Sequence, residues 1–204
     1  EFRRVLFRSE TETGITTMLM DEGMDTGAML LQESLPIFPE DTAGTLAPRL
    51  AALGGRLLVE TIARLKAGTV TPQAQNHALA TSAPPLKKEN GMIDWAVSAM
   101  SIANRVRGLS PWPGAYSYFG GERWMVWSAT VNEGKCEAVP GTILDVTKQA
   151  ILVATGAGVL VLNEIQPANS KRLTVAQYLA GHRVTIGQRF DAVPPSAPTG
   201  VNQV

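Results

Sequence analysis

Hydrophobic and polar positions alternate weakly in the first part of the chain. Residues 14–20 and 28–37 are rich in β-branched and long apolar side chains, and the acidic segment DEGMDTG at residues 21–27 separates them. Two such runs on either side of a glycine-containing segment predict two strands joined by a loop.

From residue 42 onward the apolar positions recur at three- and four-residue spacing. This period predicts a helix, with Asp41 or Thr42 as its N-cap. We expect Gly54 and Gly55 to divide the stretch into two helices, and Gly68 to end it.

A long polar stretch follows the helical pattern. Prolines at positions 72, 84 and 85 argue against regular structure in residues 70–91. We therefore place an interdomain linker at residues 76–90.

Short apolar segments replace the helical period in the second half. Ser98 begins a short helix, which Pro111 and Pro113 end. Five short segments separated by turn residues then predict a small β-barrel. They are residues 115–119, 122–131, 141–146, 149–156 and 158–167. Thr174 caps a closing helix, and the proline- and glycine-rich tail, residues 191–204, is expected to be disordered.

Composition limits the class of protein. A chain of 204 residues with 45% hydrophobic residues can bury one large core or two small ones, and we expect two. Since no run of about eighteen apolar residues occurs, we expect no membrane partner and a cytoplasmic protein. Cys136 is the single cysteine, and His77 and His182 are the only histidines, so we expect no bound metal.

Charge is distributed unevenly, although the net charge is zero. Residues 10–85 carry nine Asp and Glu against four Lys and Arg, a balance of −5. Residues 86–190 carry eleven Lys and Arg against seven Asp and Glu, a balance of +4. A basic excess in one unit is typical of a module that faces a polyanion, but it also arises by chance.

The loop at residues 21–27 is the main candidate for chemistry. It brings Asp21, Glu22 and Asp25 together between two strands, although a solvated turn is the ordinary alternative for such a loop. His77 reads as an incidental surface residue, and His182 as a cation at the C-terminal end of a helix.

Four separated blocks resemble the methionyl-tRNA formyltransferase family, in its order and spacing. They are ETGITTMLMDEGMDTGAMLL, PPLKKENGMIDW, IANRVRGLSPWPGAY and PGTILDV. The similarity extends from about Glu10 to about Phe190. It implies an α/β plus β architecture, in which the C-terminal remnant of a Rossmann-like formyltransferase domain, residues 10–75, precedes an OB-like open β-barrel that binds tRNA, residues 91–190.

The resemblance also implies an activity. Members transfer a formyl group from 10-formyltetrahydrofolate, a co-substrate, to the amino group of initiator methionyl-tRNA, without a metal. Asp25 matches the carboxylate of the family's Asn-His-Asp catalytic set, and Asp21 and Glu22 are second choices. The partner Asn-x-His segment belongs upstream of Glu10, so we expect this chain to be an inactive C-terminal fragment. We expect a monomer.

Basic side chains of the second half are the candidates for tRNA contact. They are Lys87, Lys88, Arg105, Arg107, Lys148, Lys171 and Arg172. Lys87 and Lys88 match the linker position that meets the acceptor stem in the family, and Arg107 has a structural alternative. Trp95, Trp112, Trp124 and Trp127 are interpreted as packing anchors rather than base-stacking residues.

Residues 1–9, EFRRVLFRS, have two interpretations. Three arginines among apolar residues are typical of a short basic arm. The string GAG TTC AGA CGT GTG CTC TTC CGA TCT also translates to this nonapeptide and matches a widely used sequencing adapter. We favour an adapter-like artefact and leave residues 1–9 out of the expected fold.

Two alternatives to the methionyl-tRNA enzyme stay open. Nucleotide-sugar formyltransferases share part of the same blocks. A stand-alone RNA-binding barrel, whose formyltransferase-like remnant no longer catalyses, would share the second half.

Overall fold

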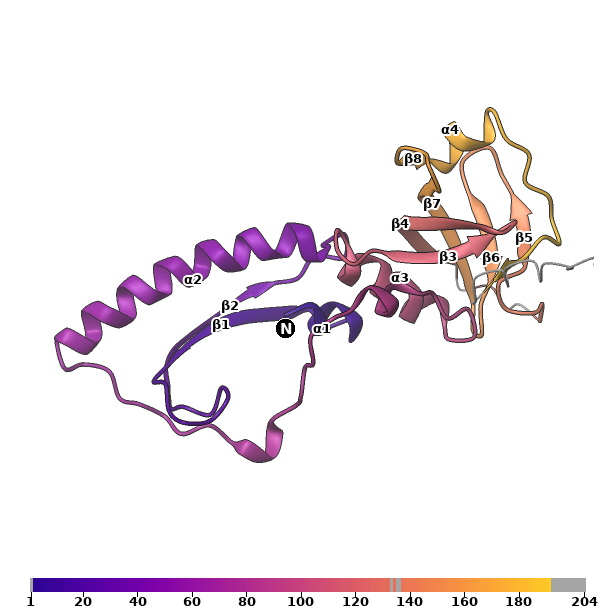
Figure 1. The fold of residues 1–204 in the computed structure, drawn as a ribbon. Coiled ribbons are helices and arrows are strands. Elements are labelled where there is room, and N and C mark those ends of the chain that lie inside the picture. Colours follow the sequence, from indigo (N-terminus) through magenta and orange to yellow (C-terminus); the bar gives the residue numbers. More distant parts are fainter. Residues whose placement is uncertain (1, 133, 135–136, 192–204) are drawn as a thin grey trace, which may run out of the picture. The chain divides into compact units, whose positions relative to one another are not determined.

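The structure is a computed structural model and describes residues 2–132, 134 and 137–191. The chain divides into two compact units, Glu1–Pro85 and Leu86–Val204 (Figure 1). Among the described residues, no helix is long and apolar enough to cross a membrane. Cys136 and the tail from residue 192 lie outside the described residues, so the disorder expected of the tail is untested.

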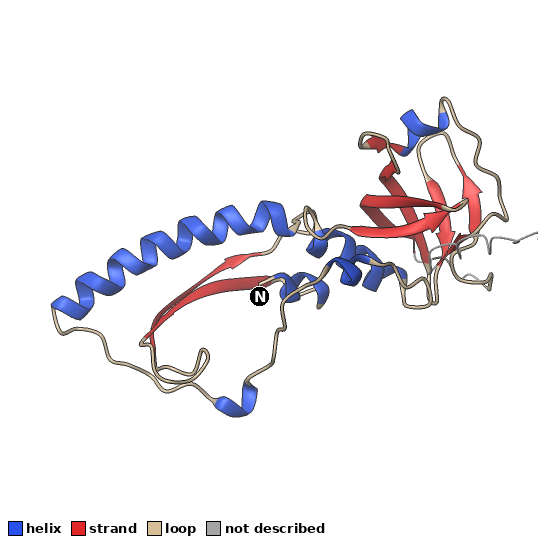
Figure 2. Ribbon diagram, viewed as in Figure 1, coloured by secondary structure: helices blue, strands red, loops and turns tan. Residues whose placement is uncertain are grey.

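The first unit is a β-hairpin covered by one long helix. Strands β1 (Glu12–Met18) and β2 (Met29–Pro36) pair antiparallel, with Gly14 opposite Ser34. Helix α2 (Ala43–Lys66) packs along both strands (Figure 2). The expected strand, loop and strand are confirmed; β1 begins and ends two residues earlier than the sequence predicted, and β2 is shorter by one residue at each end.

Helix α2 is continuous over 24 residues, so the expected break at Gly54 and Gly55 is wrong. Each glycine costs a helix only about 1 kcal/mol relative to alanine, and the buried face of α2 continues on both sides of the pair. A Cβ at Gly54 would only touch Ile15, at 3.8 Å, and one at Gly55 would meet nothing within 4 Å. Packing of the apolar face therefore outweighs the local propensity.

Both ends of α2 follow the sequence signals. Thr42 is the N-cap: its hydroxyl accepts a hydrogen bond from the Thr45 main-chain nitrogen, and the Thr45 hydroxyl accepts one from the Thr42 main-chain nitrogen, which completes a capping box. At the other end Gly68 has φ +66°, and its neighbour Thr69 donates to the Arg64 carbonyl at 3.0 Å. This is the Schellman termination expected of a glycine at this position.

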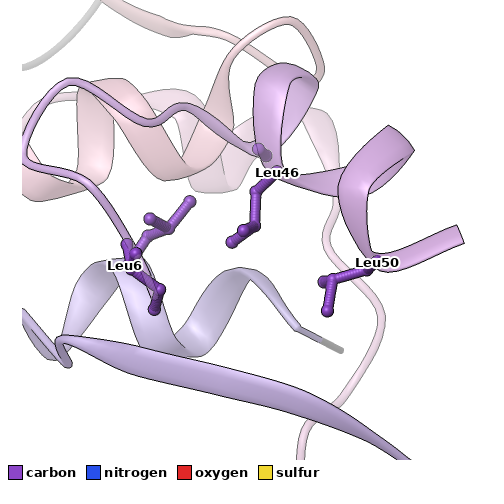
Figure 3. Packing of buried hydrophobic residues seen from close by; sticks show 5 residues of the cluster. Leu6, Leu46 and Leu50 are labelled. Atoms are coloured by element: carbon purple, nitrogen blue, oxygen red, sulfur yellow. The ribbon is translucent and has the colours of Figure 1, made fainter. Parts of the chain in front are cut away.

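Helix α1 (Arg3–Phe7) lies in the segment that we expected to fall outside the fold. Leu6 is fully buried, and Figure 3 shows it pointing toward Leu46 and Leu50 of α2. Its burial says nothing about the coding origin of residues 1–9, and the adapter origin stays a prediction.

The expected linker is less irregular than its prolines suggested. Gln73 forms an isolated bridge with Met29, through a pair of 2.8 Å main-chain hydrogen bonds. Two short 3-10 helices follow, η1 (His77–Leu79) and η2 (Lys88–Gly91). Residues 72–75 therefore lie beside the hairpin in the first unit, ahead of the expected linker at residues 76–90.

The second unit is built on one curled antiparallel sheet of seven strands (Figure 2). The strand path is β5-β6-β7-β4-β3-β9, and β8 pairs with β7. The sheet strands are β3 (Ala115–Phe119), β4 (Glu122–Asn132), β5 (Ile143–Val146), β6 (Ile151–Ala154), β7 (Val159–Pro167), β8 (Leu173–Thr174) and β9 (Phe190–Asp191). All five predicted strands are confirmed.

Residues 187–190 connect the two ends of this strand path. Ile143 of β5 donates to the Gln188 carbonyl at 2.8 Å, and Phe190 donates to the Gly141 carbonyl at 2.9 Å. Phe190 also pairs with Phe119 of β3. A sheet joined at both ends in this way is compatible with a barrel.

Two helices accompany the sheet: α3 (Ala99–Leu109), capped by Ser98, and α4 (Val175–Leu179), capped by Thr174. Both caps were predicted. Trp95 and Trp124 are buried as packing residues, and Trp95 donates to the Ser117 hydroxyl at 2.9 Å. Trp112 is 49% exposed, and its packing interpretation stays a prediction.

Candidate functional site

The loop between β1 and β2 is closed by its own polar groups. Leu19 donates to the Ala28 carbonyl at 2.9 Å across the base of the loop. The Asp21 carboxylate accepts hydrogen bonds from the Gly23 nitrogen at 3.1 Å and the Thr26 hydroxyl at 2.6 Å. Asp21 therefore stabilises the fold of the loop, and its second-choice catalytic role stays a prediction.

Asp25 has a different environment. It is exposed, it has φ +55°, and no hydrogen-bond donor of the described residues contacts its carboxylate. The left-handed region is uncommon outside glycine, although Asp and Asn adopt it more readily than other residues. The structure thus leaves the carboxylate of the family-matched Asp25 available to another molecule.

Gly27 is required by the close return of the chain. A Cβ at this position would lie 1.6 Å from the Leu19 carbonyl oxygen, so any side chain would force the loop open. The DTG sequence is therefore explained physically. Asp25 adopts a left-handed backbone conformation, the Thr26 hydroxyl donates a hydrogen bond to the Asp21 carboxylate, and Gly27 lies close against the Leu19 carbonyl.

Gln75, which was not predicted, also contacts this loop. Its side-chain nitrogen donates to the main-chain carbonyls of Asp25 and Gly27, both at 2.8 Å. No periodicity or motif marked it, because Gln75 falls in a polar, proline-flanked stretch. Only the three-dimensional path of residues 72–75 brings it to the loop.

The other acid and imidazole candidates form no further site here. Glu22 and His77 are exposed, and within the described structure neither forms a hydrogen bond or ion pair with Asp25. Across the described part of the chain, no three His, Cys, Asp or Glu side chains are grouped so that they could hold a metal ion.

Three of the seven predicted nucleic-acid residues lie around η2. They are Lys87, Lys88 and Arg105, and Asn90 links two of them. The Asn90 side-chain oxygen accepts a hydrogen bond from the main-chain nitrogen of Lys87 at 2.6 Å, and the Asn90 main-chain carbonyl accepts one from the Arg105 guanidinium at 2.6 Å. Lys88 is exposed in the same turn. In the described structure no acceptor contacts the ammonium groups of Lys87 and Lys88.

The other two predicted arginines, Arg107 and Arg172, also have partners within the unit. Arg107 donates to the side-chain oxygen of the buried Asn104 at 3.1 Å, which supports its structural alternative. Arg172 forms an ion pair with Glu164 and lies 5.3 Å from the Trp127 ring centroid. Lys171 beside it is exposed and has no acceptor among the described residues.

Lys148 lies in an open hollow with a volume of about 410 Å³. Its lining includes His182 and Arg183 but no acidic residue.

The His182 ring stacks on Tyr178 with centroids 4.2 Å apart, and its Nδ1 lies 3.0 Å from the Tyr178 carbonyl, at the end of α4. Burial, and then the charge of Glu122, raise the pKa of the Tyr178 phenol. Arg183 was not predicted, since it is far from Lys148 in sequence.

Comparison with known proteins identifies the family. Residues 1–62 match the family model described as Formyl transferase, and residues 85–183 match Formyl transferase, C-terminal domain. A methionyl-tRNA formyltransferase from Trichlorobacter lovleyi is 44% identical over 182 residues, which is 89% of this chain and 57% of the relative. Another from Solibacter usitatus is 46% identical over 185 residues, 91% of this chain and 59% of the relative.

A solved structure shares the fold. HypX from Aquifex aeolicus in complex with tetrahydrofolic acid superposes with a TM-score of 0.62 at 17% identity, over 92% of this chain and 36% of that chain. At this identity the likeness shows the fold alone.

The chain belongs to the formyl transferase family, and the expected resemblance is confirmed. It spans 57% to 59% of the length of the two curated relatives described above. The first family match includes residues 1–9, the segment for which the sequence analysis favoured an adapter origin.

Proposed function

We propose that this chain is the downstream part of a methionyl-tRNA formyltransferase. Complete, the enzyme would transfer a formyl group from 10-formyltetrahydrofolate to the amino group of initiator methionyl-tRNA. The observation that carries the proposal is the loop, in which the exposed carboxylate of Asp25 is presented by a DTG turn. Relatives that carry this name are 44% and 46% identical to the chain.

The chemistry assigns Asp25 a proton-handling role. Attack of the amine on the formyl carbon forms a carbon–nitrogen bond and a tetrahedral oxyanion, and the bond to the folate nitrogen then breaks. The amine proton must leave, and the departing nitrogen must gain a proton. A carboxylate near these groups accepts a proton directly or holds an imidazolium in place. The oxyanion donor would come from the upstream Asn-x-His segment.

The surface of α2 supports a larger transfer domain. Besides the buried stripe that packs on the hairpin, α2 carries a second apolar stripe toward its C-terminal end. Its members and their exposed fractions are Leu58 (52%), Val59 (70%), Ile62 (45%) and Leu65 (44%). A contiguous apolar stripe of this kind is typical of an interface. We propose that upstream chain of a Rossmann-like domain covers it.

The second unit is proposed to bind the tRNA as an OB-like barrel. Two groups of its exposed cations support this, one at η2 with Lys87 and Lys88, and one at the hollow with Lys148 and Arg183. Phosphate contacts from such residues supply affinity without sequence information. Arg105, Arg107, Lys171 and Arg172 remain candidates. We further propose a monomer in the cytoplasm, and an inactive chain when residues 10–204 stand alone.

Two other functions remain as alternatives. A nucleotide-sugar formyltransferase would use the same loop, but it would not require cations in the second unit. A stand-alone RNA-binding barrel would require those cations, but not Asp25.

One experiment distinguishes the three. The upstream reading frame is recovered from the source DNA, and the complete product is assayed with 10-formyltetrahydrofolate and methionyl-tRNA. The proposal expects an in-frame Asn-x-His segment and formylation of the initiator species. A start codon near Glu10, or transfer to a nucleotide sugar alone, would overturn it.

A further inference from the structure

The segment 71–82 contains one residue that is not exposed, and it is Gln75. Two residues earlier, Gln73 exchanges a pair of 2.8 Å main-chain hydrogen bonds with Met29 at the start of β2. This bridge fixes the segment beside the hairpin. It therefore sets the direction from which the Gln75 side chain reaches the loop.

The Gln75 amide spans the turn at Asp25. A primary amide carries two N–H donors. Both of its 2.8 Å acceptors are main-chain carbonyls, one at Asp25 and one at Gly27, on either side of Thr26. Within the described structure, neither carbonyl receives another hydrogen bond. The Gln75 side chain thus satisfies the carbonyls of Asp25 and Gly27, which have no partner in the β1–β2 strand pairing.

This contact lies beside a residue whose backbone conformation is uncommon outside glycine. Asp25 holds φ +55°, a conformation that persists only when the surrounding structure determines it. The carboxylate itself receives no hydrogen bond from the described residues, so its direction depends on the backbone that carries it. A donor pair on the adjacent carbonyls is suited to fix that direction.

We infer that Gln75 is a positioning residue for the transfer reaction, acting through the loop backbone on the carboxylate of Asp25. The catalytic consequence rests on the proposed function, whereas the structural consequence does not. The residue lies in the connection that leads to the second unit, so the loop is held by a segment outside the hairpin that forms it.

Three substitutions separate hydrogen bonding from packing. Gln75→Glu keeps the shape but replaces both donors by an acceptor, which two carbonyls repel. Gln75→Lys keeps donors on a flexible stem. Gln73→Ala is the matched control, because its main-chain bridge to Met29 does not need the side chain.

The first measurement is amide hydrogen exchange of residues 18–29 in the chain as it stands. We expect exchange to rise about tenfold in Gln75→Glu and less than about threefold in Gln75→Lys, and to stay unchanged in Gln73→Ala, because local opening sets the rate. Equal exchange in Gln75→Glu and the parent would overturn the inference. So would equal loosening in the Glu and Lys variants, because packing alone would then explain the effect.

The second measurement is kinetic and uses the complete gene product. Gln75→Glu should lower kcat about tenfold and leave KM for methionyl-tRNA unchanged, and Gln75→Lys should recover most of the loss. A rise in KM with unchanged kcat would overturn the positioning role. If the parent enzyme transfers no formyl group while Gln75→Glu still loosens the loop, the proposed function fails and the hydrogen-bonding role of Gln75 stands.

Discussion

The carboxylate of Asp41 accepts a hydrogen bond from the Arg49 guanidinium at 2.5 Å, where the chain turns from β2 into α2. The same carboxylate accepts from the Phe38 nitrogen at 2.8 Å and the Thr45 hydroxyl at 2.8 Å. Asp41 was a candidate N-cap, but Thr42 is the cap. Asp41 instead holds the preceding turn against the first turn of the helix.

Asp41 makes the stability of the first unit depend on pH. Burial alone raises its pKa, but the hydrogen bonds from Phe38, Thr45 and Arg49 outweigh it, so the pKa lies below its ordinary value of 3.8. Because the pKa of Asp41 is lower in the folded state than in the unfolded state, its ionised carboxylate stabilises the folded state at pH values above the unfolded-state pKa. This stabilisation is lost as the pH falls through the folded-state pKa. Acid unfolding should therefore begin below about pH 4.

The Asp41 prediction is checked by acid titration of Asp41→Asn, followed by circular dichroism. We expect a loss of about 2 kcal/mol at neutral pH and a weaker acid dependence. Glu40→Gln is the control, because Glu40 is exposed. Equal acid midpoints in the parent and Asp41→Asn would contradict the assignment.

Neighbouring leucines on α2 should differ in their contribution to stability. Leu57 is 3% exposed and packs inward, whereas Leu58 is 52% exposed. Leu57→Ala should cost about 2–4 kcal/mol through a lost apolar contact and a cavity, and Leu58→Ala less than about 0.5 kcal/mol. Urea unfolding of both variants measures the difference. Similar losses would mean that the helix face is assigned wrongly.

The first unit should open more readily than the second. A hairpin of two strands with one helix protects fewer backbone groups than a sheet of seven strands. Hydrogen exchange should therefore be faster in residues 12–66 than in residues 115–166. Equal or greater protection of the hairpin would contradict this order.

The hollow with Lys148 and Arg183 should bind tRNA through phosphates. The double variant Lys148→Glu/Arg183→Glu should weaken binding of initiator and elongator tRNAs by a similar factor and reduce the salt dependence, since each phosphate contact is independent of sequence. Arg64→Glu, in the acidic first unit, is the control. Filter binding at two salt concentrations is the measurement. Unchanged affinity, or a loss confined to initiator tRNA, would exclude this surface.

The sequence predicted local features well where one residue carries the signal. Thr42, Ser98 and Thr174 begin helices and Gly68 ends one, as their types suggested, because caps depend on neighbouring backbone groups. The predicted break at Gly54 and Gly55 was wrong, because burial of the apolar face of α2 outweighed the low helix propensity of glycine.

The site was predictable only in part, for a similar reason. Asp25 was found through a contiguous motif. Gln75 and Arg183 were missed because they reach the loop and the hollow through the path of the chain, which no local pattern records.

The most direct test of the central claim is formyl transfer by Asp25→Asn in the complete gene product. Asparagine also adopts the left-handed conformation, so the substitution removes the charge and leaves the turn intact. Glu22→Gln, in the same loop, is the control. We predict a loss of about three orders of magnitude in rate with tRNA affinity unchanged, because the carboxylate handles a proton and contacts no phosphate. A variant that keeps more than about a tenth of the parent rate would show that Asp25 does not carry the chemistry.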